Sequence, residues 1–322
     1  MKPRNENLAT MANSGSELLN RFKERTLSAN AAAGMRGCVQ RLLGGLSRVE
    51  IPLDLNSVLR ARRVDEVNFD DALKYDGHIE PLGRDFGAGF RIALRAGMPE
   101  TRLRFTLAHE ICHTFFYELV PEVKYSPQLP HRDEERLCNL GAGELLVPTD
   151  VLSRDDATKY PCLSSLEDLA ERYRVSLESM LLRLTSSGLW QCQIAQWYRL
   201  SSGRFMLDRL FGGLFRNWRT WITDDMNKVW DEPGSRKGGV CYISLIDRKR
   251  YWGSDRIYYE MKRRGDRLVM LWSARPLEVN PSDVPLFLTP FAENSVARQR
   301  PYKQGSIPGQ PSFFFLGAGA SL

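Results

Sequence analysis

The stretch that decides the fold is Arg104-Phe-Thr-Leu-Ala-His-Glu-Ile-Cys-His113, inside a helical pattern that runs from Thr101 to Leu119. Residues four apart lie one turn above each other on a helix, so His109 and His113 project from one face. Two imidazoles on one face can hold a single metal ion. Glu110 lies beside them. The spacing therefore predicts a metal site of the HExxH type.

The chemistry of such a site depends on its open position. Zinc held by two histidines and one carboxylate keeps a fourth position for water and lowers the pKa of that water to about 7. Glu110 can then act as general base in the attack on a peptide carbonyl. The alternative is purely structural, because His109 and His113 share their face with Phe105 and Phe116 and can be buried core histidines.

A third metal ligand is expected from the next helix, predicted over Asp133 to Leu146 and stopped by Pro148. The acidic residues and the histidine available there are His131, Asp133, Glu134, Glu135 and Glu144. Glu135 is the predicted ligand because it shares a helical stripe with small residues that allow close approach of the two helices. Glu134 is the second choice, with a solvated helix face as its structural alternative.

Composition sets limits on the class of protein. The chain has 322 residues, 43% of them hydrophobic and 26% charged, as in globular proteins. Its six cysteines form no CxxC pair, which argues against a disulfide framework and favours a reducing compartment. No signal peptide or membrane span is recognisable, so we expect a cytoplasmic protein. The net charge of +6 is a mild surplus that gives weak support to nucleic-acid contact.

Upstream of the metal motif we expect helices and a small sheet. Residues 1–14 are polar and predicted to be flexible, and a helix is expected from Ser16 to Leu46, broken near Gly34 and Gly37. A further helix is predicted between Ile51 and Val64. The turn signal Asp76-Gly77 and the apolar runs that end in residues 90–94 predict a small antiparallel sheet.

Downstream, the helical pattern from Ser165 to Leu184 is interrupted near Ser176, which is predicted to cap a new helix. We place a domain boundary near residue 188. Residues 189–294 hold all seven tryptophans and strand-like runs at 240–246 and 267–272, and residues 295–322 are predicted to be a flexible tail. The expected fold class is α+β, with a zincin-like helical metal site and a small antiparallel sheet in residues 15–188, followed by a β-rich C-terminal region.

Two runs together resemble a known family. The run from Arg104 to His113, followed by Glu135-Arg-Leu-Cys-Asn-Leu-Gly-Ala-Gly-Glu-Leu-Leu-Val-Pro148, resembles the ImmA/IrrE metallo-endopeptidases, whose pattern reads roughly RFTLAHELGH and then ExxANxFAAxLLxP. Similar stretches flank these motifs, so the resemblance covers about Ile51 to Leu184. It implies His109, His113 and Glu135 as zinc ligands and Glu110 as catalytic base. Members of the family are cytoplasmic peptidases that cleave helix-turn-helix repressors.

The sequence departs from this pattern at three positions. Cys112 replaces the usual glycine of the first motif, while Cys138 and Gly141 replace the alanine and phenylalanine of the second. A thiol next to a zinc ligand can crowd the metal or compete for it when deprotonated. We expect Cys112 to be a small buried filler instead, because cysteine packs as a modest hydrophobe.

Two weaker signals point elsewhere. The segments 247–252 and 262–264 mix basic and aromatic residues, a combination that suits a phosphate backbone with stacked bases and equally suits an exposed strand and turn. The closing residues 313–322 are similar to the strand and glycine-rich loop that open sirtuin-like domains, but no helix follows to bind phosphate.

These observations lead to one main functional hypothesis, a zinc-dependent endopeptidase that acts on a protein substrate, plausibly a helix-turn-helix transcriptional repressor. The alternative is a catalytically silent peptidase-like regulator or DNA-binding protein with a structural metal. A toxin-antitoxin or phage-defence role is compatible with the resemblance but is not distinguished by the residues.

Overall fold

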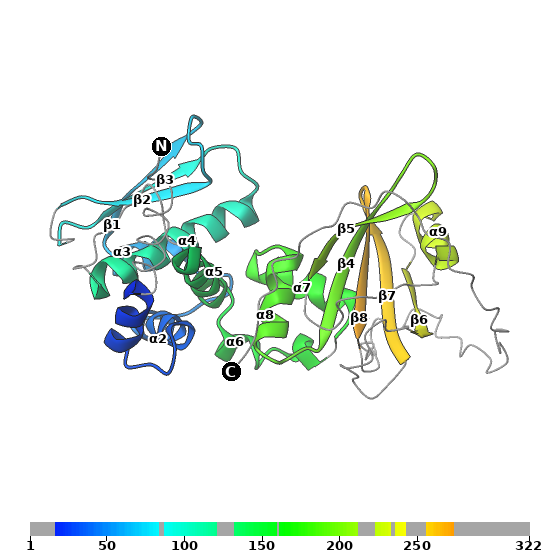
Figure 1. The fold of residues 1–322 in the computed structure, drawn as a ribbon, viewed down its shortest axis with the longest axis horizontal. Coiled ribbons are helices and arrows are strands. Elements are labelled where there is room, and N and C mark those ends of the chain that lie inside the picture. The colour runs from blue at the N-terminus through cyan, green and yellow to red at the C-terminus, as the bar shows by residue number, and fades with distance from the viewer. Residues whose placement is uncertain are drawn as a thin grey trace, which may run out of the picture. The chain divides into compact units, whose positions relative to one another are not determined.

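The computed structural model describes residues 17–83, 87–120, 132–159, 161–211, 223–232, 236–242 and 256–273 (Figure 1). After a helix over residues 17–25, the elements up to the second motif are α2 (Ala31–Gly44), α3 (Leu55–Ala61), β1 (Val64–Asp70), β2 (Gly77–Pro81), β3 (Phe90–Arg95), α4 (Glu100–Leu119) and α5 (Arg132–Leu146). They are followed by α6 (Thr149–Leu152), η1 (Asp156–Lys159), α7 (Leu163–Tyr173), α8 (Leu177–Ser186), β4 (Cys192–Arg199), β5 (Phe205–Phe211), α9 (Thr223–Asp231), β6 (Arg236–Tyr242), β7 (Arg256–Arg264) and β8 (Arg267–Ser273). The α+β class predicted from the sequence is confirmed.

The small sheet has the strand order β1-β3-β2. The predicted antiparallel pairing is present between β2 and β3, whereas β1 pairs with β3 in parallel, so the sheet is mixed. The parallel pairing arises because β1 is followed by β2 at the opposite edge, and β3 returns between them. Helix α4 packs against this sheet, with Ile79, Ile92 and Ile111 in one core.

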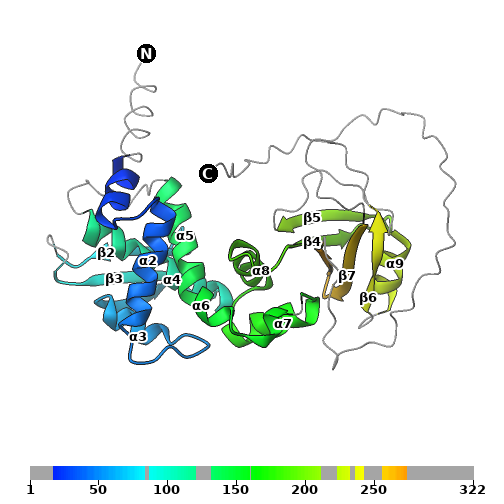
Figure 2. The same ribbon diagram turned by 90° about the horizontal axis from the view of Figure 1, so that it is seen from below.

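The metal motif and the second motif lie on α4 and α5, whose bounds agree closely with the predicted helices. Helix α5 packs against α4 and, on another side, against α2, which Figure 2 shows alongside it. Small or short side chains permit this approach: Ala108 of α4 and Cys138 and Ala142 of α5 are completely buried. Two packed helices therefore carry every described candidate residue of the site.

The predicted break of the first helix at Gly34 and Gly37 is wrong. Both glycines lie within α2, and the break falls at residues 26–30, where Asn30 caps α2 by accepting a hydrogen bond from the Ala33 backbone N–H. Leu27 occupies the left-handed region at φ 52°. The left-handed turn at Leu27 ends the first helix, and the Asn30 cap, which satisfies a free N–H of the first turn, starts α2 upstream of both glycines.

The helix predicted from Ile51 to Val64 is shorter than expected. Helix α3 begins after Asp54, whose carboxylate accepts hydrogen bonds from the backbone N–H groups of Asn56 and Ser57, and it ends at Ala61. Val64 already starts β1, because Arg63 adopts the left-handed conformation at φ 56° and turns the chain.

The C-terminal elements form three layers. The five-stranded antiparallel sheet has the order β5-β4-β8-β7-β6. On one face, residues of α7 and α8 share a core with Ile194 and Leu271, and on the other face Met226 and Val229 of α9 pack against residues such as Met270 (Figures 1 and 2). Ser176 caps α8 as predicted. The domain boundary near residue 188 stays a prediction.

Several sequence predictions lie outside the described residues. They concern the tails 1–14 and 295–322, most of the strand-like run 240–246, the basic-aromatic segment 247–252 and the glycine-rich segment 313–322. No helix among the described residues has the length and apolar character needed to cross a membrane.

Candidate metal centre

Helix α4 places the two histidines of the first motif one above the other. The Nε2 atoms of His109 and His113 lie 3.1 Å apart, and the ring centroids are separated by 4.9 Å. The side chain of His109 is 11% exposed and that of His113 is 6% exposed. Both rings therefore turn the same nitrogen toward one point at the edge of the core.

Glu135 of α5 meets both rings at that point. One carboxylate oxygen lies 3.1 Å from Nε2 of His109, and the other lies 3.2 Å from Nε2 of His113. Partial burial acts to raise the pKa of this carboxyl, but the hydrogen bonds from the two histidines outweigh burial and hold the pKa below its ordinary value. His109, His113 and Glu135 thus form a group whose ligand atoms all lie within 4.8 Å of one another.

The remaining ring nitrogens are also occupied. Nδ1 of His109 lies 3.0 Å from Oδ1 of Asn139, and Nδ1 of His113 lies 2.7 Å from Oε1 of Glu134. A histidine that ligates a metal usually donates its other ring N–H to such an acceptor, which fixes the tautomer and ring orientation. This arrangement leaves both Nε2 atoms available as ligands, so the residues present fit a tetrahedral zinc with an open position.

Glu110 follows His109 on α4 and points toward β2. Its side chain packs on Gly77, where an added Cβ would lie 2.7 Å from Oε1 of Glu110 and 2.6 Å from Cγ2 of Thr106. Burial raises the pKa of the Glu110 carboxyl, an effect that His113 and His109 partly offset. A buried carboxyl of raised pKa beside two histidines is suited to accept and return a proton.

Two of the departures from the family pattern, Cys112 and Gly141, lie next to each other, so the space left at 141 is filled by the thiol of Cys112. A Cβ added at Gly141 would meet Sγ of Cys112 at 2.7 Å and Sδ of Met35 at 2.9 Å. The thiol of Cys112 and the side chain of Met35 therefore fill space that a larger residue at 141 would need. Burial raises the pKa of the Cys112 thiol well above its usual value, so the thiol stays neutral. Cys112 is the small buried filler that we expected, with an exposed fraction of 0%.

The other acidic candidates lie elsewhere. Glu144 is buried but pairs with Arg183, with a carboxylate oxygen 2.7 Å from the guanidinium, and it also accepts from the Thr149 backbone. Asp133 lies 3.7 Å from Arg136 at the surface of α5. His131 is outside the described residues. Glu134 does contact the site, but on the far nitrogen of His113.

Two contacts were not assigned from the sequence. The sequence predicts Glu134 only as a second-choice ligand, and Asn139 appears there only as the asparagine of the second motif. The available signal for Asn139 was the asparagine of the second motif, which lies four residues after Glu135 and hence one helical turn away. No sequence signal distinguished the position of Glu134.

A second group could also hold an ion. His113, Glu134 and Cys138 bring one ring nitrogen, one carboxylate oxygen and one sulfur within 4.8 Å of one another, and all three residues are buried. Burial raises the pKa of the Cys138 thiol to about 12. The first group is the better candidate for a site with an open position, because the side chain of Glu135 is 36% exposed, whereas all three residues of the second group are buried.

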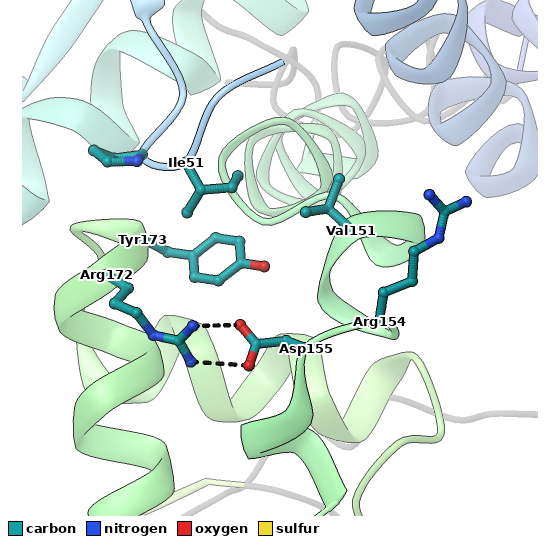
Figure 3. Close-up of a pocket in the computed structure, with 7 residues that line it drawn as sticks. Ile51, Val151, Arg154, Asp155, Arg172 and Tyr173 are labelled. Carbon is teal, nitrogen blue, oxygen red and sulfur yellow. Dashed lines mark hydrogen bonds and ion pairs between the residues drawn. The ribbon is translucent and has the colours of Figure 1, made fainter.

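A separate hollow of about 470 Å³ contains no residue of the metal centre. It is lined by Ile51, Pro52, Val151, Arg154, Asp155, Arg172 and Tyr173 (Figure 3). Arg172 pairs with Asp155 across its floor, as the dashed lines in Figure 3 show, and the Tyr173 ring lies beneath Ile51. The charges of that pair already neutralise each other, and we assign the hollow no ligand.

The basic triplet 262–264 is largely committed to contacts within the protein. Lys262 pairs with Glu167 at 2.8 Å, and Arg263 stacks on Trp230 at 4.6 Å while donating a hydrogen bond to the Trp230 carbonyl oxygen. Two of the three basic side chains are therefore engaged within the protein.

A pair of packed helices that directs two histidines and a glutamate to one point, beside a buried glutamate, has the architecture of a zincin-type metallopeptidase. The comparison with known families agrees. Residues 67–185 match the model of the IrrE N-terminal-like domain, which supports the ImmA/IrrE assignment that the motifs predicted.

Two curated relatives are radiation response metalloproteases IrrE. The protein of Deinococcus deserti is 33% identical over 114 residues, which cover 32% of this chain and 40% of that protein. The protein of Deinococcus radiodurans is 36% identical over 95 residues, which cover 28% of this chain and 29% of that protein. The chain thus matches less than half the length of either relative.

Among solved structures, a Mycobacterium tuberculosis transcriptional regulator aligns with a TM-score of 0.47 at 14% identity. The alignment covers 81% of this chain and 80% of that protein. The likeness is too weak to support a conclusion about function.

Proposed function

We propose that the chain is a zinc-dependent endopeptidase in which His109, His113 and Glu135 bind the metal and Glu110 is the general base. The observation that carries this proposal is the convergence of both histidine Nε2 atoms on the two oxygens of Glu135. When bound, zinc would supply a Lewis acid and a water molecule of lowered pKa.

Glu110 provides the proton transfers in this proposal. Its carboxylate accepts a proton from the attacking water and passes it to the leaving amine nitrogen when the peptide bond breaks. The Glu110 side chain packs on Gly77, which keeps its carboxylate beside the ligands. Burial favours the protonated form of the carboxyl more than solvent exposure would. Both properties suit a group that must alternate between base and acid.

An extended polypeptide is the substrate class that fits the surroundings of the base. Among the described residues, β2 pairs on one side only, with β3, so the strand that carries Gly77 is an edge of its sheet. Edge strands bind extended peptides through main-chain hydrogen bonds. A peptide aligned along β2 would bring its carbonyl groups past Glu110.

The particular substrate is proposed from resemblance. ImmA/IrrE peptidases cleave helix-turn-helix repressors, and two relatives of this chain are named radiation response metalloproteases. Both facts support a regulatory peptidase that removes a DNA-binding repressor in the cytoplasm.

A silent regulator with a structural metal is the second candidate, and the observation that favours it is the fully buried ligand group of His113, Glu134 and Cys138. Salt-dependent DNA binding that is equal in wild type and Glu110→Gln, without cleavage, would support this candidate. Absence of DNA binding at low salt would exclude its DNA-binding form.

The decisive experiment incubates wild type and Glu110→Gln with a candidate helix-turn-helix repressor, and measures intact repressor mass and bound zinc. We expect cleavage by wild type, a loss of about 10²- to 10⁴-fold in the variant, and zinc in both. Glu118→Gln is the matched control, because Glu118 lies on the same helix but is exposed and pairs with Arg62. Equal cleavage by wild type and Glu110→Gln would refute the role of Glu110.

A further inference from the structure

The two metal-site histidines are held by different kinds of partner. Nδ1 of His109 meets Asn139, a neutral amide on an exposed residue, at 3.0 Å. Nδ1 of His113 meets Glu134, a carboxylate that is only 2% exposed, at 2.7 Å. A hydrogen bond to a buried carboxylate is the shorter and stronger of the two.

Consecutive residues of α5 contact opposite nitrogens of one ring. Glu134 reaches Nδ1 of His113, and Glu135 reaches Nε2 of the same ring at 3.2 Å. The ring is therefore fixed on both sides by one turn of one helix. Its orientation depends on the helix pair as a unit rather than on α4 alone.

We propose that Glu134 is a positioning residue that holds His113 as the Nδ1–H tautomer and directs its Nε2 lone pair at the metal. This inference rests on the proposed function, because it assigns the metal to the Nε2 side. A carboxylate that accepts from a ligating imidazole raises the basicity of the ligand. His113 is thus the stronger of the two histidine ligands, and Asn139 gives His109 orientation without charge.

Burial explains why Glu134 needs this partner. An ionised carboxylate inside a protein is costly unless it is paired and hydrogen-bonded. Glu134 lies on the buried face of α5. One of its carboxylate oxygens accepts a hydrogen bond from the ring N–H of His113. A carboxylate retained at such a position indicates a role that an apolar residue cannot fill.

The competing arrangement puts an ion on the other side of the ring. His113, Glu134 and Cys138 form the second ligand group described above, in which Glu134 would be a ligand. The two arrangements differ in tautomer and in ligand chemistry. In our proposal Nδ1 carries a proton and sulfur is not bound, whereas in the alternative Nδ1 is bare and Cys138 is a thiolate ligand.

The first test needs no variant. Zinc-loaded wild type with ¹⁵N-labelled histidine should show a protonated Nδ1 for His113, with a downfield proton resonance protected from exchange. Only four histidines occur in the chain, which makes assignment feasible. A bare Nδ1 on His113 would overturn the proposal even if no Glu134 variant folded.

The second test measures zinc affinity by chelator competition in full-length wild type, Glu134→Gln and Asp133→Asn. We expect Glu134→Gln to bind zinc about 10- to 100-fold more weakly and to shift the His113 resonance while leaving that of His109 in place. Asp133→Asn removes the same charge one position away, where the residue is surface-exposed and pairs with Arg136, and should bind zinc as wild type does. Unchanged affinity and an unchanged His113 resonance in Glu134→Gln would overturn the proposal.

Cobalt substitution distinguishes metal binding on the Nε2 side from binding in the group that contains Cys138. A thiolate charge-transfer band that disappears in Cys138→Ala would place the ion in the second group and overturn our assignment, and its absence supports the Nε2 side. If wild type binds no zinc at all, the proposed function fails. If wild type and Glu134→Gln bind zinc equally and the His113 resonance is unchanged, only the role of Glu134 fails.

Discussion

The helix pair α4 and α5 and the five-stranded sheet place their charged groups differently. Among the described residues, the buried acidic, basic and histidine side chains lie on α4, α5 or α8, and they are Glu110, His113, Glu134, Glu144 and Arg183. In the sheet, charged side chains such as Lys262 and Arg199 are partly exposed and pair with neighbours. Burying a charged group is costly, so the concentration of such groups in these helices marks them as the candidate functional region.

The largest expected effect tests whether the chemistry belongs to the helix pair. His113→Ala removes one proposed ligand and leaves Glu134 and Glu135 without their shared ring, so stoichiometric zinc that survives dialysis in wild type should be lost. Metal content by mass spectrometry checks this result. His78→Ala is the control, because His78 lies on β2 outside both ligand groups, and it should retain zinc. Full zinc occupancy in His113→Ala would move the metal elsewhere.

The next effect tests the joint between α5 and α8. Arg183 and Glu144 have side chains that are 8% and 3% exposed, so Arg183→Met leaves a buried charge unpaired. We expect a loss of about 3–5 kcal/mol in the free energy of unfolding, measured by chemical denaturation. Arg48→Met breaks the exposed pair with Glu50 and should cost about 0–1 kcal/mol. Equal costs for the two variants would mean that burial does not distinguish these pairs.

A smaller effect tests the packing behind the ligands. Gly141→Ala places a Cβ 2.7 Å from the Cys112 sulfur, which should destabilise the protein by about 1–3 kcal/mol. The double variant with Cys112→Ala should recover part of that loss, with a coupling of at least about 0.5 kcal/mol. Gly44→Ala is the matched control on α2, where no atom lies within 4 Å of the added Cβ, and it should be neutral or slightly stabilising. Strictly additive costs at 112 and 141 would contradict the compensation.

The smallest effect is expected at a partly exposed ion pair between the sheet and α7. Lys262→Ala removes the pair with Glu167, whose side chains are each 26% exposed, and should lower the free energy of unfolding by less than about 1 kcal/mol. Zinc content should not change. Loss of zinc in this variant would show that the contact between α7 and β7 is coupled to the metal centre, and the contrast between the two regions would disappear.

Local signals explain which parts of the fold were predictable. Helices α4 and α5 carry strong periodic patterns bounded by prolines, and Ser176 is a capping residue at a clear interruption, so these elements were predicted closely. Gly34 and Gly37 misled because a helix interior tolerates glycine when Asn30 supplies a cap upstream. The parallel pairing of β1 with β3 could not be predicted, because it depends on β3 inserting between β1 and β2, which no local sequence signal encodes.

The candidate site divides in the same way. The spacing of His109, Glu110 and His113 is a property of a single helix and can be deduced from periodicity alone. Glu135 required the relative position of two helices, and the second motif supplied it. Glu134 and Asn139 reach the Nδ1 atoms of His113 and His109 because of how α5 is rotated about its own axis. The sequence does not predict that rotation.

Gly77 shows how a position without a side chain can belong to a catalytic apparatus. An added Cβ would meet Cγ2 of Thr106 at 2.6 Å and the far end of Glu110 at 2.7 Å, so a side chain at 77 has to displace both residues. Under the proposed function, a mutational scan that scores folding and cleavage separately should find that every substitution at 77 lowers cleavage and that the larger ones lower folding as well. Such a profile would show that the proposed base needs the space that the absent side chain of Gly77 leaves.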